Sequence, residues 1–532
     1  MSKHWWQTGV VYQIYPRSFK DDNGDGVGDL PGIISKLDYL NDGTPNSLGV
    51  DAIWISPFYP SPMKDFGYDV ADYCDVNPLF GTLDDFDRLL AEAHKRGIRV
   101  IIDWVPNHTS DEHPWFIESR SSRDNPKADW YFWRDAKPDG SLPNNWGSHF
   151  GGPAWSYDAT RSQYYLHQFD PGQPDLNWRN PQVKAAMLDV LRFWLARGVD
   201  GFRMDVVYMI MKHPDLPDQP WVNNPQARAA NDLYFRQEQI YSHSHPDIFP
   251  LMHEIRTLLD SYGDKVGIGE IWIEPEKWVQ YYGTPEQPGL HLPFNFRLIT
   301  TPWTAEAVRA EVEFMESLIP AWGWPNYVLN NHDQQRLASR LGQQHVRNAA
   351  LLLLTLRGTP TLYMGEELGM LNGHIQPDQV RDPQGLRMGL ENTRDFCRTP
   401  IPWDASPNGG FGTGTPWLPV NPDYETRNVA AQQADSQSVL ALYKRLIWLR
   451  KQSAALAQGR YASVASEPGI YAYTRQADDE TLLVVLNFSS EARQHPVPSQ
   501  AEIVLNTTLD RGGPVSGALN LSPYEGVLLK LS

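Results

Sequence analysis

Cysteine is scarce in this 532-residue chain, which contains only Cys74 and Cys397. Two cysteines cannot build the set of disulfides that supports small secreted proteins. Long apolar runs are also missing: the longest aliphatic stretch, residues 349–356, is far shorter than the roughly 20 residues that cross a bilayer. The first residues carry no apolar segment of signal-peptide length. We therefore expect a reduced, cytoplasmic protein that has no membrane partner.

Positive charge is in short supply as well. The chain has 46 Lys and Arg against 64 Asp and Glu, which gives a formal net charge of −18. Such a field repels a polyanion, so we expect no nucleic-acid partner. Hydrophobic residues make up 41% of the chain, as in ordinary globular proteins. Because the chain is longer than one hydrophobic core usually supports, more than one domain is expected.

Short apolar segments alternate with amphipathic ones along most of the chain. Residues 83–96 and 181–197 have helical spacing, and each segment follows a helix-start signal, Thr82 in one case and Asn180 in the other. The runs between the helical segments are typical of strands buried on both faces, and they lie at residues 10–15, 51–56, 99–103, 200–205, 266–270, 291–294, 327–330 and 361–363. Repeated strand–helix units indicate a parallel sheet, and eight of them predict an α/β fold, the (β/α)8 TIM barrel.

Two regions break this alternation. Residues 105–171 are rich in Trp, Pro, Gly, Asn and Asp and follow the third strand, which predicts an inserted subdomain. From residue 455 onward, short strands follow one another without helices, at residues 469–474, 481–487 and 526–531. This pattern predicts a C-terminal antiparallel β-sandwich over residues 455–532. The barrel is then expected to comprise residues 1–104 and 172–454.

Acidic residues stand at the ends of several predicted strands, where TIM barrels place their catalytic groups. Asp205 closes the fourth strand, Glu270 closes the fifth, and Asp333 follows the seventh. Gathering acids costs free energy because like charges raise one another's pKa values, so stability alone does not explain the pattern. Three carboxylates suit glycoside cleavage: one attacks the anomeric carbon, one transfers the proton, and one stabilises the oxocarbenium-like transition state. We expect Arg203 to keep Asp205 ionised and apolar neighbours to surround Glu270.

Five segments resemble motifs of the α-amylase family of glycoside hydrolases, most closely its oligo-1,6-glucosidase and α-glucosidase branch. They occur in the family's order and lie on the predicted strands or directly after them. They are DWVPNHT at residues 103–109, QPDLNW at 173–178, GFRMDVV at 201–207, GIGEIW at 267–272 and NNHDQQR at 330–336. The resemblance implies that Asp205 is the nucleophile, Glu270 the acid/base and Asp333 the transition-state stabiliser.

The resemblance also implies which residues hold the first glucose. Asp65 and Arg398 correspond to a pair that grips the 4-hydroxyl of a terminal glucose and closes the pocket behind it, which explains exo action. An ordinary surface ion pair is the alternative interpretation, and Arg394 is a second candidate for the partner of Asp65. The other implied contacts come from His108, Arg203, His332 and the stacking ring of Tyr68.

Linkage preference is indicated by two features. The QPDLN segment resembles the oligo-1,6-glucosidase version of its motif, and Val206, directly after the nucleophile, resembles enzymes that prefer α-1,6 bonds. We therefore predict a retaining, exo-acting α-glucosidase for short α-glucosides with a lean to α-1,6 bonds, while maltose, sucrose and trehalose remain open substrates. A trehalose synthase-type isomerase on the same scaffold is the alternative, although Val206 differs from the Ala common in those enzymes. A non-catalytic binding protein is a poorer match, because such relatives have lost the catalytic acids.

The loop after the first predicted strand carries oxygen-bearing side chains at alternate positions, which suits a hard cation. Its position twelve is Gly32 rather than Glu, so an EF-hand helix pair is not expected. The resemblance implies a structural calcium or magnesium ion in this loop and no organic cofactor. A turn-rich loop without metal is the alternative. The implied ligands are Asp21, Asn23, Asp25, the Val27 carbonyl and Asp29.

Overall fold

A closed ring of short parallel strands forms the centre of the protein. The computed structural model describes residues 3–223 and 232–531. Within them, seven strands follow the order β10-β1-β2-β3-β7-β8-β9, and nearly every residue in these strands is buried. The strands are β1 (Val11–Ile14), β2 (Ala52–Ile55), β3 (Arg99–Trp104), β7 (Gly201–Met204), β8 (Val266–Gly269), β9 (Leu292–Pro293) and β10 (Thr361–Tyr363).

The predicted strand at residues 327–330 is shorter than expected. It appears only as two isolated parallel bridges, Asn295 to Tyr327 and Val328 to Thr361. The side chain of Asn326 donates to the Thr359 carbonyl over 2.8 Å. In a continuous parallel ladder, a backbone amide would donate to this carbonyl instead. The two bridges lie between the ends of β9 and β10 and complete the ring. The predicted (β/α)8 barrel is thus confirmed, with seven strands and a bridged eighth segment.

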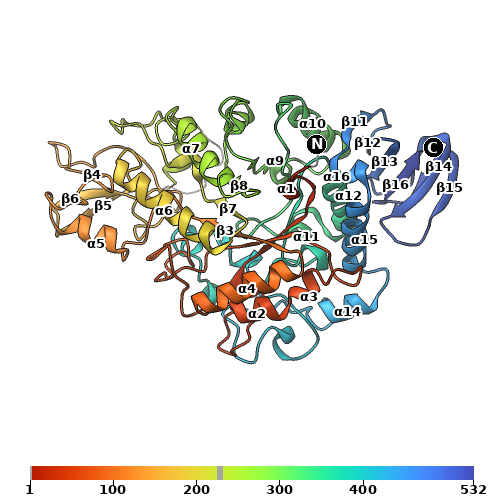
Figure 1. Ribbon diagram of the computed structural model, residues 1–532, viewed down its shortest axis with the longest axis horizontal. Helices are drawn as coiled ribbons and strands as arrows, with labels where there is room; N and C mark the ends of the chain where they lie inside the picture. The colour runs from red at the N-terminus through yellow and green to blue at the C-terminus, as the bar shows by residue number, and fades with distance from the viewer. Residues whose placement is uncertain (1–2, 224–231, 532) are drawn as a thin grey trace.

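Helices surround this ring, as Figure 1 shows. Both predicted start signals are confirmed: the Thr82 side chain accepts from the Asp85 amide, and the Asn180 side chain accepts from the Gln182 amide. These caps satisfy amides that have no partner inside a helix. The larger outer helices are α4 (Leu83–Lys95), α6 (Pro181–Arg197), α7 (Ile248–Asp260), α10 (Ala305–Leu318), α12 (Val346–Thr355) and α15 (Val439–Gln452).

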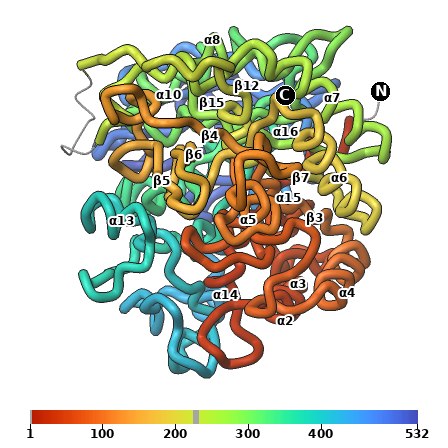
Figure 2. The backbone as a smooth tube through the Cα atoms, turned by 90° about the vertical axis from the view of Figure 1, so that its left-hand side faces the viewer, coloured from red at the N-terminus to blue at the C-terminus, as the bar shows by residue number. Residues whose placement is uncertain are grey.

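Two additions flank the barrel on opposite sides (Figure 1). The segment between β3 and α6 carries α5 (Pro114–Ser121) and a three-stranded antiparallel sheet of order β4-β6-β5, which faces the viewer in Figure 2. The C-terminal strands form one six-stranded antiparallel sheet of order β11-β12-β13-β16-β14-β15, with an apolar cluster of its own. The predicted inserted subdomain is present, and the predicted C-terminal antiparallel β domain is present as a single six-stranded sheet. Their strands are β4 (Trp133–Arg134), β5 (Trp155–Asp158), β6 (Gln163–Leu166), β11 (Arg460–Val464), β12 (Ile470–Ala477), β13 (Glu480–Asn487), β14 (Arg493–Asn506), β15 (Gly513–Leu521) and β16 (Gly526–Leu531).

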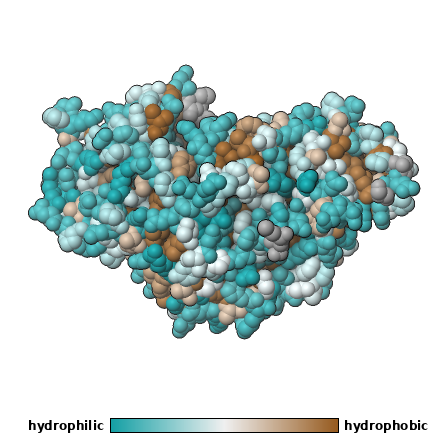
Figure 3. Space-filling model, turned by 45° about the horizontal axis from the view of Figure 1, so that its top comes forward, coloured by the Kyte–Doolittle hydropathy of each residue, from teal (hydrophilic) through white to brown (hydrophobic). Residues whose placement is uncertain are grey.

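The surface mixes polar and apolar residues, and the apolar ones gather in a few separate patches on the face shown in Figure 3. In the described part of the chain, no helix combines the length and the apolar character needed to cross a membrane.

Candidate active site

The three predicted catalytic acids lie together at the carboxyl ends of the barrel strands. The backbone amide of Asp205 donates to the Trp104 carbonyl and that of Glu270 donates to the Met204 carbonyl, each over 2.9 Å. Sheet hydrogen bonding therefore continues past β7 and β8 and fixes both acids. Asp333 follows the bridged segment, and all three line one cavity of about 60 Å³. Its other lining residues are Asp65, Tyr68, His108, Phe150, Phe169, Val206 and Arg394.

The buried side chain of Arg203 contacts three of the acids in this cluster. Its side chain is 1% exposed, and its Nη1 donates to Asp205 over 2.7 Å and to Asp103 over 2.6 Å. Its Nη2 donates to Glu270 Oε2. One guanidinium thus holds the predicted nucleophile and the predicted acid/base side by side, which is the arrangement that double displacement needs.

The charges of this cluster act on Asp205 in opposite directions. Burial raises the pKa of Asp205 well above its usual range, and the nearby carboxylates of Glu270, Asp103 and Asp333 add to the rise. Arg203 lowers the pKa of Asp205, as expected, and that it keeps Asp205 ionised stays a prediction. Burial likewise raises the pKa of Asp103, to about 6. The physical reason is that one buried cation serves three acids.

Asp333 behaves in the opposite way. Burial favours its neutral form, but the neighbouring His332, Arg394 and Arg398 together hold the pKa of Asp333 well below its usual range. Arg398 Nη2 donates to its Oδ1 over 2.8 Å, and Arg394 Nη1 lies 3.2 Å from the same oxygen. Asp333 therefore stays ionised, which is what stabilisation of a positive transition state requires.

Glu270 is held by donors on both oxygens. Trp272 Nε1 donates to Oε1 over 3.0 Å, and the Val206 amide donates to Oε2 over 3.1 Å. The expected apolar neighbours are present, since Ile268 and Ile271 are buried. Arg203 and the indole N–H of Trp272 also contact Glu270, so the surroundings of Glu270 are more polar than the sequence indicated.

The predicted first-sugar residues also converge. Tyr68 OH lies 2.7 Å from His332 Nε2, and the two rings stack with centroids 5.4 Å apart. Gln13 Nε2 lies 2.7 Å from His332 Nδ1, and because the amide nitrogen donates, Nδ1 accepts. Burial lowers the pKa of His108 to about 3, so its imidazole is neutral, and burial also lowers the pKa of His332, against the opposing effect of Asp333. A neutral imidazole can share hydrogen bonds with sugar hydroxyls without adding charge.

The predicted ion pair between Asp65 and Arg398 is wrong, because Arg394 takes that place. Arg394 Nη2 lies 2.6 Å from Asp65 Oδ1 and 2.6 Å from Asp382 Oδ1. Arg398 is held elsewhere: its Nε donates to the His332 carbonyl over 2.9 Å, and its guanidinium lies over the Tyr15 ring. Spacing along the chain could not separate two arginines four residues apart, and the buried Asp382 that fixes Arg394 carried no signal in the sequence.

Two further residues organise the site without having been singled out. Gln173, in the QPDLNW segment, donates from Nε2 to Asp65 over 3.0 Å, and the same atom lies 3.1 Å from His108 Nε2. Lys212 is fully buried, pairs with Asp175 at 2.9 Å and donates to Asn107 Oδ1 over 2.7 Å. In the sequence, the QPDLNW motif marked Gln173 and Asp175 only as similar to the oligo-1,6-glucosidase branch. Lys212 lies in a segment that matches no catalytic motif.

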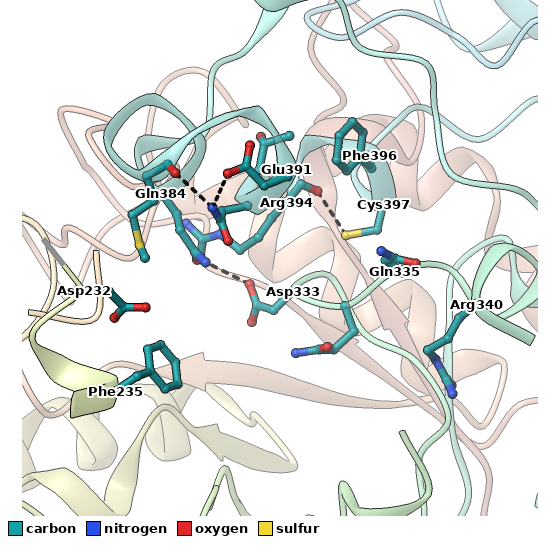
Figure 4. A pocket seen from close by; sticks show the side chains of 14 residues that line it. Asp232, Phe235, Asp333, Gln335, Arg340, Gln384, Glu391, Arg394, Phe396 and Cys397 are labelled. Carbon is teal, nitrogen blue, oxygen red and sulfur yellow. Dashed lines mark hydrogen bonds and ion pairs between the residues drawn. The ribbon is translucent and has the colours of Figure 1, made fainter. Parts of the chain in front are cut away.

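A wider cavity of about 560 Å³ adjoins the catalytic one, and the two share Asp333 and Arg394. Figure 4 shows Asp333 and Arg394 at its centre, with Asp232 and Phe235 on one side and Glu391 and Phe396 on the other. Most of its other lining side chains are polar, including Gln335, Gln384 and Asn392. The site therefore has a narrow inner end and a broad polar outer end.

The predicted cation loop is folded by hydrogen bonds to its own backbone. Asp21 accepts from the amides of Gly24 and Gly26 over 2.6 and 3.0 Å, and Asp29 accepts from the Gly32 amide over 2.6 Å. Gly26 has φ 91°, and a Cβ there would lie 1.9 Å from the Thr415 carbonyl oxygen, so only glycine fits. Among the described residues, no group of three or more His, Cys, Asp or Glu side chains is arranged to hold a metal ion. Calcium or magnesium binding stays a prediction.

Comparison with known proteins agrees with this architecture. The chain matches the family described as alpha amylase, catalytic domain, over residues 13–459, and the alpha-amylase SusG C-terminal domain over residues 470–528. It is 43% identical to a probable alpha-glucosidase of Rhizobium meliloti (strain 1021), covering 93% of this chain and 91% of the relative. It is 40% identical to an oligo-1,6-glucosidase of Parageobacillus thermoglucosidasius over the full length of both.

Among solved structures, an alpha-glucosyl transfer enzyme, XgtA, is 41% identical and superposes with a TM-score of 0.94 over all of both chains. Sequence identity at this level over the whole length, together with the match to the catalytic domain, settles the family. This chain belongs to the α-amylase family of glycoside hydrolases.

Proposed function

We propose that the protein is a retaining, exo-acting α-glucosidase that releases glucose from the non-reducing end of short α-glucosides and leans toward α-1,6 linkages. The observation that carries this proposal is the gathering of Asp205, Glu270 and Asp333 around one small cavity. The Asp65–Arg394 ion pair lines the same cavity and restricts it to the end of a sugar chain.

The proposed reaction has two displacements. In the first, ionised Asp205 attacks C1 of the glucose while Glu270 gives its proton to the leaving oxygen, and a β-glucosyl ester forms on Asp205. In the second, the Glu270 carboxylate takes a proton from water, the water oxygen attacks C1, the C1–O bond to Asp205 breaks with its electron pair returning to the Asp205 carboxylate, and α-glucose leaves. Arg203 stabilises the Asp205 carboxylate, and ionised Asp333 stabilises the positive charge that develops at the anomeric carbon.

The proposed α-1,6 lean rests on Val206. Val206 follows the nucleophile directly and lines the catalytic cavity, so we expect it to border the leaving group. Its backbone has φ 34°, an uncommon conformation for a β-branched residue, and its amide is fixed by Glu270. A side chain on a backbone fixed in this way can discriminate between leaving groups, although a methyl group contributes only about 1 kcal/mol.

Two measurements test the proposal. Proton NMR of the first glucose released from p-nitrophenyl α-glucoside, whose leaving group is not a sugar, is expected to show the α-anomer, and initial release of β-glucose would exclude double displacement. Rates are then compared on isomaltose, maltose, trehalose, sucrose and a long dextrin. Isomaltose is expected to react faster than the dextrin, whereas a preference for the dextrin would contradict a cavity closed behind the first glucose.

A second candidate is a transglucosylase or trehalose synthase-type isomerase. Two observations favour it: the similarity to an alpha-glucosyl transfer enzyme and the broad polar cavity beside the catalytic one, which has room for an acceptor sugar. Incubation with maltose followed by separation of the products distinguishes the two. Mostly glucose supports the hydrolase, and mostly trehalose or longer glucosides supports the transferase.

We also propose that residues 21–29 bind a structural calcium or magnesium ion. The donor set consists only of oxygen atoms, which suits hard cations. A carboxylate oxygen that accepts one amide hydrogen bond keeps a second lone pair, so Asp21 and Asp29 can hold an ion without losing these bonds. The loop does not line the catalytic cavity, so the ion would support the fold rather than the reaction.

A further inference from the structure

The loop that carries Asp65 has an uncommon backbone conformation. Met63 and Phe66, on either side of Asp65, have φ of 65° and 48°, in the left-handed region that residues with a side chain adopt only at a cost in free energy. Gly67 follows with φ 107°. Such a conformation persists only where surrounding contacts hold it. The place of Asp65 in the catalytic cavity therefore depends on the contacts that hold this loop.

One set of contacts comes from Asp69, at the C-terminal end of the loop. The carboxylate of Asp69 is fully buried and accepts from the backbone amides of Lys64 and Asp65 over 2.8 and 3.0 Å. These two bonds fix the backbone at Lys64 and Asp65. They do not involve Met63 or Phe66, the two residues with the uncommon φ.

Arg17 contacts both of these flanking residues. It lies in the single helical turn Pro16–Ser18 after β1 and is 7% exposed. Its guanidinium carbon lies 4.9 Å from the centre of the Phe66 ring, and its Nη1 lies 3.5 Å from Met63 Sδ. The Trp417 ring is 4.7 Å from the same carbon. Aromatic rings attract a cation placed over their faces, so Arg17 holds the Phe66 side of the loop.

The stability of the fold does not by itself explain Arg17. Burial lowers the pKa of Arg17, which means that its charged form is disfavoured where it lies. Its Nε has no hydrogen-bond partner among the described residues. A buried cation with an unpaired donor is unfavourable unless its other contacts serve a purpose. Those contacts go to the two residues that flank Asp65.

The support behind Arg17 is itself fixed by hydrogen bonds. The Gly28 amide donates to the Arg17 carbonyl over 2.8 Å, and the Trp417 amide donates to the Gly26 carbonyl over 3.0 Å. Trp417 Nε1 donates to Ser18 Oγ over 2.9 Å. Segments near residues 17, 26 and 417 therefore form one support, against which the Asp65 loop packs.

We propose that Arg17 is a positioning residue for the first glucose, because it sets the place of the Asp65 carboxylate through Phe66 and Met63. The inference rests on the proposed function, in which the catalytic acids act on C1 of a terminal glucose. The 4-hydroxyl lies across the pyranose ring from C1, so Asp65, which closes the same cavity, faces that hydroxyl. Arg17 is not among the residues that line the catalytic cavity, so it acts through the loop and not on the sugar.

The experiment measures how strongly the enzyme recognises the 4-hydroxyl. The kcat/KM for p-nitrophenyl α-glucoside is divided by that for its 4-deoxy analogue, and we call this ratio the discrimination factor. In the wild-type chain the factor should be about 10–100, because a hydrogen bond to a charged group is lost with the hydroxyl. Arg17→Met keeps a long side chain but removes the guanidinium, so the factor should fall by about fivefold or more.

Two results of this comparison would overturn the proposal. One is a wild-type chain that does not distinguish the two substrates, because Asp65 would then not hold the 4-hydroxyl. The other is an unchanged discrimination factor in Arg17→Met. A purely structural role for Arg17 would lower kcat/KM for both substrates equally and would leave the factor where it was.

Three further variants separate positioning from loss of stability. Arg17→Lys keeps a cation near the rings and should retain more of the factor than Arg17→Met. Phe66→Leu removes the ring from a half-buried side chain and should lower the factor, with no further fall when it is combined with Arg17→Met. Arg475→Met is the matched control, because Arg475 is also buried, has its pKa lowered by burial and donates to the carbonyls of Thr355 and Gly459. It should lower the melting temperature and leave the factor unchanged, and an equal fall in Arg475→Met would refute the assignment.

A binding measurement distinguishes failure of this inference from failure of the proposed function. Methyl α-glucoside and methyl 4-deoxy-α-glucoside are titrated calorimetrically into Asp205→Asn, which forms no glucosyl ester, with and without Arg17→Met. If the wild-type chain cleaves no α-glucoside but Arg17→Met reduces the binding preference for the 4-hydroxyl, the proposed reaction is wrong and the role of Arg17 stands. If α-glucosides are cleaved and Arg17→Met keeps the full preference, the role assigned to Arg17 is wrong.

Discussion

Arg394 and Asp65 form an ion pair 2.6 Å long between two segments that are 329 residues apart in the chain. The same guanidinium lies 2.6 Å from Asp382 and 3.2 Å from Asp333. Arg394 therefore links the end of the cavity to the proposed transition-state stabiliser. A substitution at the sugar-binding end of the cavity is therefore expected to alter the charge environment of Asp333.

A double-mutant cycle tests which arginine serves Asp65. Asp65→Asn and Arg394→Gln should each lower kcat/KM for isomaltose, and their coupling energy should be about 1–3 kcal/mol because they contact each other. The coupling between Asp65→Asn and Arg398→Gln should stay below roughly 0.5 kcal/mol. Thermal melts of each variant control for misfolding. Stronger coupling to Arg398 than to Arg394 would contradict the geometry.

Glu270→Gln tests the role of the acid/base through the leaving group. A glutamine cannot donate a proton, so kcat for isomaltose should fall by about 10²–10⁴-fold. Formation of the glucosyl-enzyme from p-nitrophenyl α-glucoside should fall far less, because p-nitrophenolate leaves without a proton. The burst of p-nitrophenol in stopped-flow experiments measures this step. Equal losses on both substrates would argue that Glu270 has another role.

The raised pKa of Asp205 predicts where activity is lost in acid. Asp205 must be ionised to attack, so kcat/KM should fall as the pH drops through its raised pKa, and this acidic limb should lie above the usual range of an aspartate. Asp103→Asn removes one of the negative charges that raise this pKa, so the limb should move to lower pH. The apparent value belongs to the coupled acids together. A shift to higher pH in Asp103→Asn would contradict this account.

Chelation tests the cation proposed for residues 21–29. EDTA should lower the melting temperature by about 2–6 °C, and added calcium should restore it, because an ion that binds only the folded state stabilises it. The glucose-release rate at 25 °C should change little, since the loop does not line the catalytic cavity. Asp25→Asn provides a variant with weaker binding. Identical melting curves with and without EDTA, together with no calcium uptake, would show that backbone hydrogen bonds alone hold the loop.

Much of this architecture follows from local pattern in the sequence. Buried apolar runs gave the barrel strands, and Thr82 and Asn180 gave helix starts that the structure confirms. The segment at residues 327–330 is predicted as a strand but forms only two bridges, and the Asn326 side chain, rather than a backbone amide, donates to the Thr359 carbonyl beside it. Hydrophobic period does not report such an exchange, since the same residues are buried in either case.

The proposed catalytic residues could be predicted from the sequence for a similar reason, because each of them follows a predicted strand. What sequence could not supply was the choice between arginines, because Asp382 selects Arg394 by a contact that depends on how the segment at residues 371–394 folds. The raised pKa of Asp205 also could not be predicted from the sequence. Its pKa depends on burial and on three other carboxylates that meet only in space.

The last prediction concerns the buried pair of Lys212 and Asp175, whose side chains are both 0% exposed and lie 2.9 Å apart. Lys212→Met leaves the Asp175 carboxylate buried without its cation, which should destabilise the fold by about 3–5 kcal/mol. The double variant Asp175→Asn/Lys212→Met removes both charges and should recover most of that loss, as calorimetric melting will measure. Because Lys212 also donates to Asn107, whose Nδ2 lies 3.1 Å from His108 Nδ1, the double variant should remain impaired in kcat/KM even when its stability is restored. A double variant as unstable as Lys212→Met alone would mean that packing, rather than charge, makes this lysine necessary.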